Sequence, residues 1–126
     1  MPVTKLAEKL PNKQMILTDE NGATRFVYMS EILYVTANHN DLIIETINGI
    51  INAKLSISRF MKQVDGDFLK VHRSYAINLN YMSKLERYII TMTNGEKIPV
   101  PVKRYNNIRD ELMKIYGAER LNENCD

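Results

Sequence analysis

This sequence has few residues that could form covalent bonds or bind a metal. Its 126 residues include one cysteine, Cys125, so no internal disulfide can form and nothing calls for an oxidising compartment. The two histidines, His39 and His72, could in principle form a base or ligand pair, but a loop histidine and a strand-end histidine are the simpler interpretation. There is no Gly-rich phosphate loop, His-Glu-x-x-His, paired-cysteine or Gly-x-Ser-x-Gly motif. We expect no enzyme activity, no cofactor and no metal.

Long apolar runs are missing as well. No run approaches the roughly 20 residues needed to span a bilayer, and the first 13 residues lack the apolar core of a signal peptide. We therefore expect a cytoplasmic chain without a membrane partner. A hydrophobic content of 44% and a charged content of 25% are typical of a globular domain, and the length fits one domain.

Positive charge is concentrated in one stretch, from Phe68 to Arg109. This stretch holds eight lysines and arginines against two acids, a local charge of +6, whereas the whole chain carries only +2. The remainder is therefore mildly acidic, at −4. A basic, strand-rich stretch on such a domain indicates a surface for a polyanion.

Short alternating or apolar runs predict antiparallel strands. The runs are Met15–Thr18, Arg25–Met29, Ile32–Val35, Leu42–Ile47, Ile50–Lys54, Phe68–Val71, Tyr75–Leu79, Tyr88–Thr93 and Lys97–Val100. Asn-Gly pairs at 21–22, 48–49 and 94–95 supply the positive φ angles of hairpin turns. Because Pro99 and Pro101 bracket Val100, we place the last strand at a sheet edge or interpret it as a strand exit. The residues 36–41 between two runs predict a polar loop.

Two short helices complete the predicted mainly β fold. One spans about Ser56 to Val64, with apolar residues on one face and Ser56 as its cap. The other begins near Val102 and is expected to end at Gly117. We interpret residues 1–13 as a linker or flexible arm, 14–117 as the domain and 118–126 as a polar tail.

Three polar clusters are suited to nucleic acid. They are the loop residues His39, Asn40 and Asp41, the tripeptide His72-Arg73-Ser74, and Lys103-Arg104 at the start of the last helix. Arg73 could make a bidentate contact with guanine, Asn40 could pair with adenine, and Lys103 could contact guanine or a phosphate. Composition alone leaves a protein-interaction module as the larger alternative, because cations near strand ends are usually just solvated.

Three blocks, in the same order, resemble one family. Residues 68–78, FLKVHRSYAIN, are similar to the F-x-x-x-H-R-S-Y-x-V-N block of the LytTR domain, the DNA-binding output domain of LytR/AgrA-type bacterial response regulators. Residues 94–100, NGEKIPV, are similar to its N-G-x-x-x-P-V-S block, and residues 31–35, EILYV, resemble its D-I-x-Y-I-E strand. The resemblance covers Lys13 to Leu112, about four-fifths of the chain.

The resemblance implies about ten mostly antiparallel strands in three small sheets, an elongated β sandwich whose loops enter successive major grooves of duplex DNA. It implies contacts from Asn38–Asp41, Arg73 and Lys103-Arg104, and homodimers on paired direct repeats in transcriptional regulation by a two-component system. The sequence departs from the family where Thr36 replaces an acid and where Pro101 to Arg104 replace Ser-Arg-Arg. No receiver domain precedes it, which leaves a stand-alone protein or the output half of a larger regulator; the linker-like start favours the second.

Some roles stay open between contact and packing. His72 either touches DNA or packs and orients Arg73, and Lys70 is either a phosphate contact or a solvated residue. An RNA or single-strand binder would need Tyr34, Tyr75 and Tyr88 to share an exposed sheet face for stacking. A protein-interaction module would need a contiguous exposed apolar patch.

Overall fold

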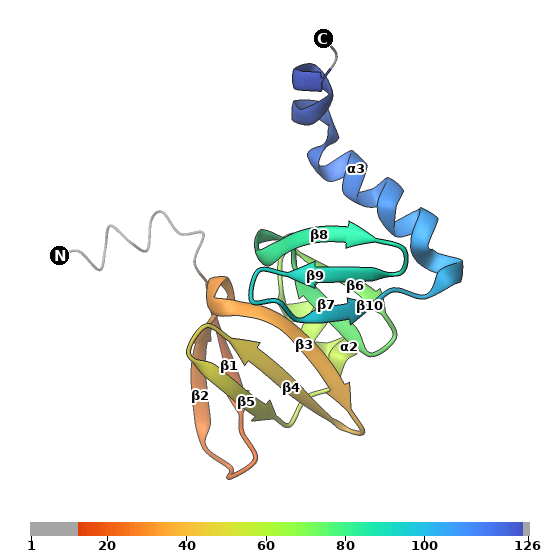
Figure 1. Cartoon of the computed structure of the whole chain (residues 1–126). Helices are drawn as coiled ribbons and strands as arrows, with labels where there is room; N and C mark the ends of the chain where they lie inside the picture. The colour runs from red at the N-terminus through yellow and green to blue at the C-terminus, as the bar shows by residue number, and fades with distance from the viewer. Residues whose placement is uncertain (1–12, 125–126) are drawn as a thin grey trace, which may run out of the picture. The chain divides into compact units, whose positions relative to one another are not determined.

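A computed structural model describes residues 13–124, with side chains up to residue 116, and it shows the mainly β fold that the sequence predicts (Figure 1). Within residues 13–124, ten strands form three antiparallel sheets of two, five and three strands, accompanied by two α-helices and two single turns of 3-10 helix. The chain divides into two compact units, of which the N-terminal unit ends at Tyr81 and the C-terminal unit begins at Met82.

The N-terminal unit contains the two-stranded and the five-stranded sheets. Its elements are β1 (Gln14–Thr18), β2 (Thr24–Tyr28), η1 (Met29–Glu31), β3 (Ile32–Asn38), β4 (Asp41–Thr46), β5 (Gly49–Ala53), α2 (Ile57–Gln63), β6 (Phe68–His72), β7 (Tyr75–Asn78) and η2 (Leu79–Tyr81). β1 pairs with β2, and the five-stranded sheet has the order β5-β4-β3-β7-β6. The pairs β1–β2, β3–β4, β4–β5 and β6–β7 join strands that follow each other in the chain, while β3 pairs with the distant β7, as in Thr36 with Tyr75 and Tyr34 with Ile77.

The turn between β1 and β2 is built around Asp19. One carboxylate oxygen accepts hydrogen bonds from the backbone N–H groups of Asn21 and Ala23, both at 2.9 Å, and Gly22 has the positive φ of 85° that the turn needs. The hydrogen bond from the Ala23 N–H lowers the pKa of Asp19; burial opposes this, and the Asn21 N–H and the Arg25 guanidinium, 3.4 Å away, add to the lowering.

The main core gathers buried residues of helix α2, of the five-stranded sheet and of the β1–β2 hairpin, which contributes Met15, Leu17 and Val27. Ile57 and Phe60 of α2 are buried against Val35, Leu42 and Ile44, and the Phe60 ring meets Phe68 edge to face at 5.5 Å. Burying each such side chain contributes about 1.5–3 kcal/mol. The predicted Ser56 cap is present, since its hydroxyl accepts the Arg59 N–H at 3.2 Å.

Asn78 is a buried polar residue that ties two strands together. Its side-chain N–H donates to the Ile32 carbonyl at 2.9 Å, and its side-chain oxygen accepts the N–H of Asn80 at 3.0 Å. Asn78 is only 1% exposed, so water cannot replace these partners. Asn78, the last residue of the family-like block at residues 68–78, therefore has a structural role.

The C-terminal unit consists of a three-stranded sheet and a long helix. Its elements are β8 (Met82–Glu86), β9 (Ile89–Met92), β10 (Lys97–Pro99) and α3 (Val102–Asn124). The sheet order β10-β9-β8 places β10 at an edge, as its prolines predict. The turn before it has Gly95 at φ 91°, which confirms the third Asn-Gly turn.

Two predicted boundaries are wrong, and one strand is not predicted. The polar loop over residues 36–41 shrinks to two residues, because β3 continues to Asn38 and β4 starts at Asp41. Strand β8, which contains Lys84, is not predicted because its side chains are half-buried or exposed and do not alternate between buried and exposed. Helix α3 passes Gly117 and reaches Asn124, since one glycine costs a helix only about 1 kcal/mol. The arm predicted over residues 1–13, apart from Lys13, and Cys125 lie outside the described residues.

Candidate nucleic-acid interface

The hairpin of β3 and β4 presents the first predicted cluster. Asn38 and Asp41 form the last strand pair, and His39 and Asn40 make a two-residue turn beyond it. All four side chains are exposed. His39 has a φ of 59°, and it is the non-glycine residue with positive φ among residues 13–124. The turn accounts for this conformation, because two-residue hairpin turns favour positive φ at one or both central residues, a conformation that histidine adopts less readily than glycine.

The second cluster is the turn between β6 and β7. Arg73 and Ser74 occupy it, and the Arg73 side chain is exposed. Just before the turn, strand β6 carries a bulge, because Lys70 pairs with Ala76 while His72 pairs with Tyr75. The extra residue, Val71, is completely buried. The bulge therefore anchors the strand at Val71 and sets the direction in which the turn leaves the sheet.

A backbone hydrogen bond joins the end of β3 to the turn between β6 and β7. The Ala37 N–H donates to the Ser74 carbonyl at 2.8 Å, and the neighbouring pair in the register is Thr36 with Tyr75. The end of β3 and the start of β7 therefore lie side by side, so both turns leave the same end of the five-stranded sheet. Figure 1 shows β3 and β4 as the long orange and olive hairpin that carries one of them.

Lys54 belongs to the same end of the sheet, although the sequence did not single it out. It directly follows β5, whose last residue Ala53 pairs with Leu42, the neighbour of Asp41. The Lys54 side chain is exposed, and its backbone N–H donates to the Thr18 carbonyl at 2.9 Å. The Asn48-Gly49 turn in the sequence could have predicted this position of Lys54. After a tight hairpin turn, β5 must end beside the start of β4.

Lys70 and His72 differ from the exposed cluster residues. Lys70 is half-buried and already interacts within the fold. His72 is also half-buried, and its ring meets Tyr75 edge to face at 5.4 Å. Neither side chain is presented to solvent as Arg73 is.

Lys103 and Arg104, the third cluster, lie in the first turn of α3 in the C-terminal unit. Both side chains are exposed, and the Arg104 N–H donates to the Pro101 carbonyl at 2.9 Å. A helix start combines free N–H groups with the positive end of the helix dipole, which favours a phosphate. By contrast, Lys84 lies 3.8 Å from Glu86 and Arg109 lies 3.4 Å from Asp110, so these two cations each have an acid beside them.

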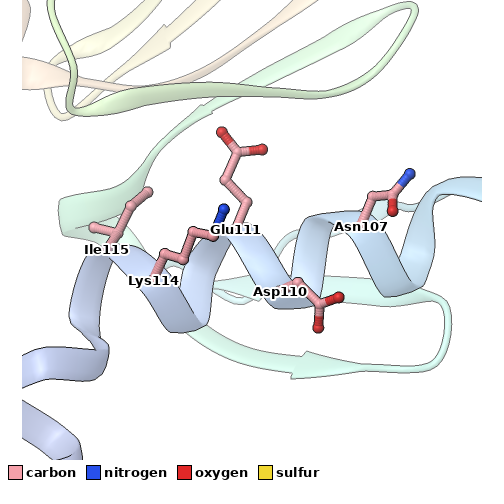
Figure 2. Close-up of a pocket in the computed structure, with 5 residues that line it drawn as sticks. All are labelled: Asn107, Asp110, Glu111, Lys114 and Ile115. Carbon is pink, nitrogen blue, oxygen red and sulfur yellow. The ribbon is translucent and has the colours of Figure 1, made fainter.

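Further along α3 the surface changes character. Figure 2 shows a shallow depression lined by five side chains of this one helix: Asn107, Asp110, Glu111, Lys114 and Ile115. Two acids and one lysine would repel a phosphate more than attract it. The two exposed cations at the start of α3, Lys103 and Arg104, are therefore not continued by a positive surface at this depression.

The tyrosines do not form the stacking platform that single-strand binding requires. Tyr34 is 9% exposed and Tyr75 is half-buried against His72. Tyr88 is 39% exposed, but it lies in the C-terminal unit and packs edge to face on Tyr105 at 5.5 Å. In the helices that the structure describes, none is long and apolar enough to cross a membrane.

Antiparallel sheets with exposed polar turns at one end, and a basic helix start in a separate unit, are features that β-type nucleic-acid-binding domains share. The family described as the LytTr DNA-binding domain matches residues 22–113, and the chain belongs to this family. It is thus a DNA-binding domain of the kind that serves response regulators as output in transcription regulation.

A solved structure supports the fold assignment. The chain is similar to one described as the LytTr DNA-binding domain of a methyl-accepting/DNA response regulator from Bacillus cereus. The two share 23% sequence identity with a TM-score of 0.68, over 79% of this chain and 96% of the other. No curated protein matches the chain.

Proposed function

We propose that this chain binds double-stranded DNA sequence-specifically to control transcription, with the turns at 39–40 and 73–74 entering a major groove. The hydrogen bond between the Ala37 N–H and the Ser74 carbonyl, 2.8 Å long, supports this proposal most directly. It ties the 73–74 turn to strand β3, and β3 leads into the 39–40 turn at the same end of the sheet. Base readout requires such fixed geometry, because donors and acceptors on base edges are only a few ångströms apart.

Each side chain at this end of the sheet suits a particular partner. The Arg73 guanidinium can donate two hydrogen bonds to O6 and N7 of guanine, and the amides of Asn38 and Asn40 can pair with adenine. The Asp41 carboxylate can accept from cytosine N4. His39 can donate or accept, depending on its tautomer.

Phosphate contacts supply the affinity in this proposal. Lys103 and Arg104 at the start of α3, and Lys54 beside the reading turns, are the cations that we assign to phosphates. Lys70 stays a weaker candidate because it is half-buried. Binding that depends on such contacts falls steeply as salt concentration rises, since each contact releases a condensed counterion.

Two copies of the chain, bound to paired direct repeats, would together be more specific than one copy alone. Two short turns read only a few base pairs, and a second copy on an adjacent site adds its own discrimination. We further propose that a receiver domain controls the chain in a longer bacterial, cytoplasmic regulator.

The test is a fluorescence-anisotropy titration of duplexes tiled across the region upstream of the gene that encodes the chain, against scrambled duplexes. Wild type should prefer one native duplex. Arg73→Ala should lower the ratio of specific to scrambled affinity about 5- to 150-fold, the value of one bidentate base contact. Arg73→Lys keeps the positive charge but loses the planar guanidinium that donates two parallel hydrogen bonds. It should therefore lower the ratio of specific to scrambled affinity while retaining the affinity for scrambled DNA. An unchanged ratio in both variants would refute Arg73 as a base reader.

One observation favours a protein partner as a second function. The outer face of the β1–β2 hairpin is uncharged and carries exposed Ile16, Phe26 and Tyr28, at 63%, 60% and 41%. Ile16 and Phe26 are direct cross-strand neighbours. If this face is the functional one, Phe26→Ser should abolish activity in the cell and leave the DNA titration unchanged.

A further inference from the structure

We propose that His72 is a positioning residue, which holds the Arg73 turn through its Nδ1 atom and does not itself contact DNA. The inference rests on the proposed function, in which Arg73 reads a base. It deepens that function by naming what keeps the reader in place.

The Arg73-Ser74 turn lacks the usual means of closing a hairpin. Two-residue hairpin turns favour conformations with positive φ at one or both central residues, normally supplied by glycine or asparagine. Neither Arg73 nor Ser74 has a positive φ. Turns with negative φ at both positions tend to splay the strands, so this turn needs support from outside its own backbone.

His72 supplies that support from inside the hairpin. Its Nδ1 atom accepts the Ser74 N–H at 3.0 Å, which spans the residue Arg73. This is the geometry of an Asx turn, in which a side-chain acceptor binds the N–H two residues later. The Ser74 carbonyl is held in turn by the Ala37 N–H at 2.8 Å. Both backbone polar groups of Ser74 are thus engaged, and Arg73 is fixed between two anchored residues.

The imidazole ring is itself held in place. The bulge buries Val71 and brings His72 opposite Tyr75, where the two rings meet edge to face at 5.4 Å and 80°. An acceptor role for Nδ1 leaves the ring proton on Nε2. The ring therefore serves as a fixed acceptor on the protein side of the turn.

Side-chain length gives a sharp test. The side-chain oxygen of asparagine lies as many bonds from Cα as Nδ1 of histidine does, whereas that of glutamine lies one bond further. His72→Asn should therefore keep the ratio of specific to scrambled affinity within about twofold of wild type. His72→Gln and His72→Ala should lower it at least about fivefold, a substantial part of the Arg73→Ala loss. Circular dichroism and thermal unfolding of each full-length variant verify that it is folded.

A double-mutant cycle separates positioning from contact. In an Arg73→Ala background, His72→Ala should cause no further loss of the ratio, because no reader remains to be positioned. An equal loss in both backgrounds would overturn the proposal and make His72 a DNA contact. Failure of His72→Asn to rescue a folded protein would overturn it too.

The hydrogen bond can also be measured without DNA. In uniformly ¹⁵N-labelled protein, a coupling across the hydrogen bond between the Ser74 nitrogen and His72 Nδ1 should be present in wild type, and its absence would contradict the inference. This readout separates the two ideas. If wild type binds native and scrambled duplexes equally, the proposed function fails while the coupling still reports on the turn. If wild type discriminates but the cycle is additive, only the role of His72 fails.

Discussion

His39 occupies a backbone conformation that histidine disfavours, so replacing it with glycine should stabilise the protein. Its φ is 59°. A side chain in the left-handed region costs roughly 1–2 kcal/mol, and glycine removes this cost but gives back about 0.4–1 kcal/mol through the greater freedom of the unfolded chain. The expected net effect of His39→Gly is a gain of about 0–1.5 kcal/mol in the free energy of unfolding.

Asn40 provides a matched control one residue away. It is exposed in the same turn, but its φ is not positive. Asn40→Gly therefore relieves no strain and should cost about 0.4–1 kcal/mol. The two variants should shift the free energy of unfolding in opposite directions, although both remove an exposed polar side chain from one turn.

Equilibrium urea unfolding, followed by far-ultraviolet circular dichroism, measures both changes. The same variants are then titrated with the native duplex, where both should bind less tightly than wild type. A stabilised His39→Gly variant with weakened binding would show strain retained for contact. If His39→Gly destabilises the protein as much as Asn40→Gly does, the strain argument is refuted.

Three further outcomes are expected. Lys103→Ala should weaken binding to native and scrambled duplexes alike and reduce the slope of log affinity against log salt by about 1, whereas Lys114→Ala, beside the acids of the same helix, should change neither in anisotropy titrations. Asn78→Ala should cost about 1–3 kcal/mol in urea unfolding, because the buried Ile32 carbonyl loses its donor. Asp19 has a lowered pKa, so it stabilises the fold above its ordinary value of 3.8, and this stabilisation is lost as pH falls through the lower folded pKa. Asp19→Asn should therefore be less stable near neutrality and should lose less stability on acidification in pH-dependent unfolding.

Local rules predict most of the fold. The three Asn-Gly pairs lie at real hairpin turns, where Gly22, Gly49 and Gly95 have φ values of 85°, 127° and 91°. Proline chemistry places β10 at its edge. Strand β8 escapes prediction because Met82 and Leu85, its two apolar half-buried residues, are three apart and fit no period of two.

The site depends on non-local pairing, which the residues alone do not reveal. The sequence marks Asn38–Asp41 and Arg73 as separate polar clusters. Only the register of β3 against β7 makes Ala37 a neighbour of Ser74 and brings the clusters to one end of a sheet. Lys54 joins them through a second register, that of β4 against β5. The hydrophobic periodicity of a sequence predicts which side chains share one face of a strand or helix. It does not predict which strand ends lie next to each other in the sheet.

Most residues of the family-like block at residues 68–78 serve to build and hold one turn, at Arg73-Ser74. Phe68, Val71 and Asn78 are each no more than 6% exposed and fix the hairpin to the sheet, and His72 accepts the N–H that spans Arg73. Arg73 is the residue of the block that is left pointing to solvent at the turn. Lys70 of the same block is half-buried and stays the weaker phosphate candidate. If the block mainly positions Arg73, differences in the sequence that is read should arise chiefly from the other turn, at residues 38–41, where all four side chains are exposed.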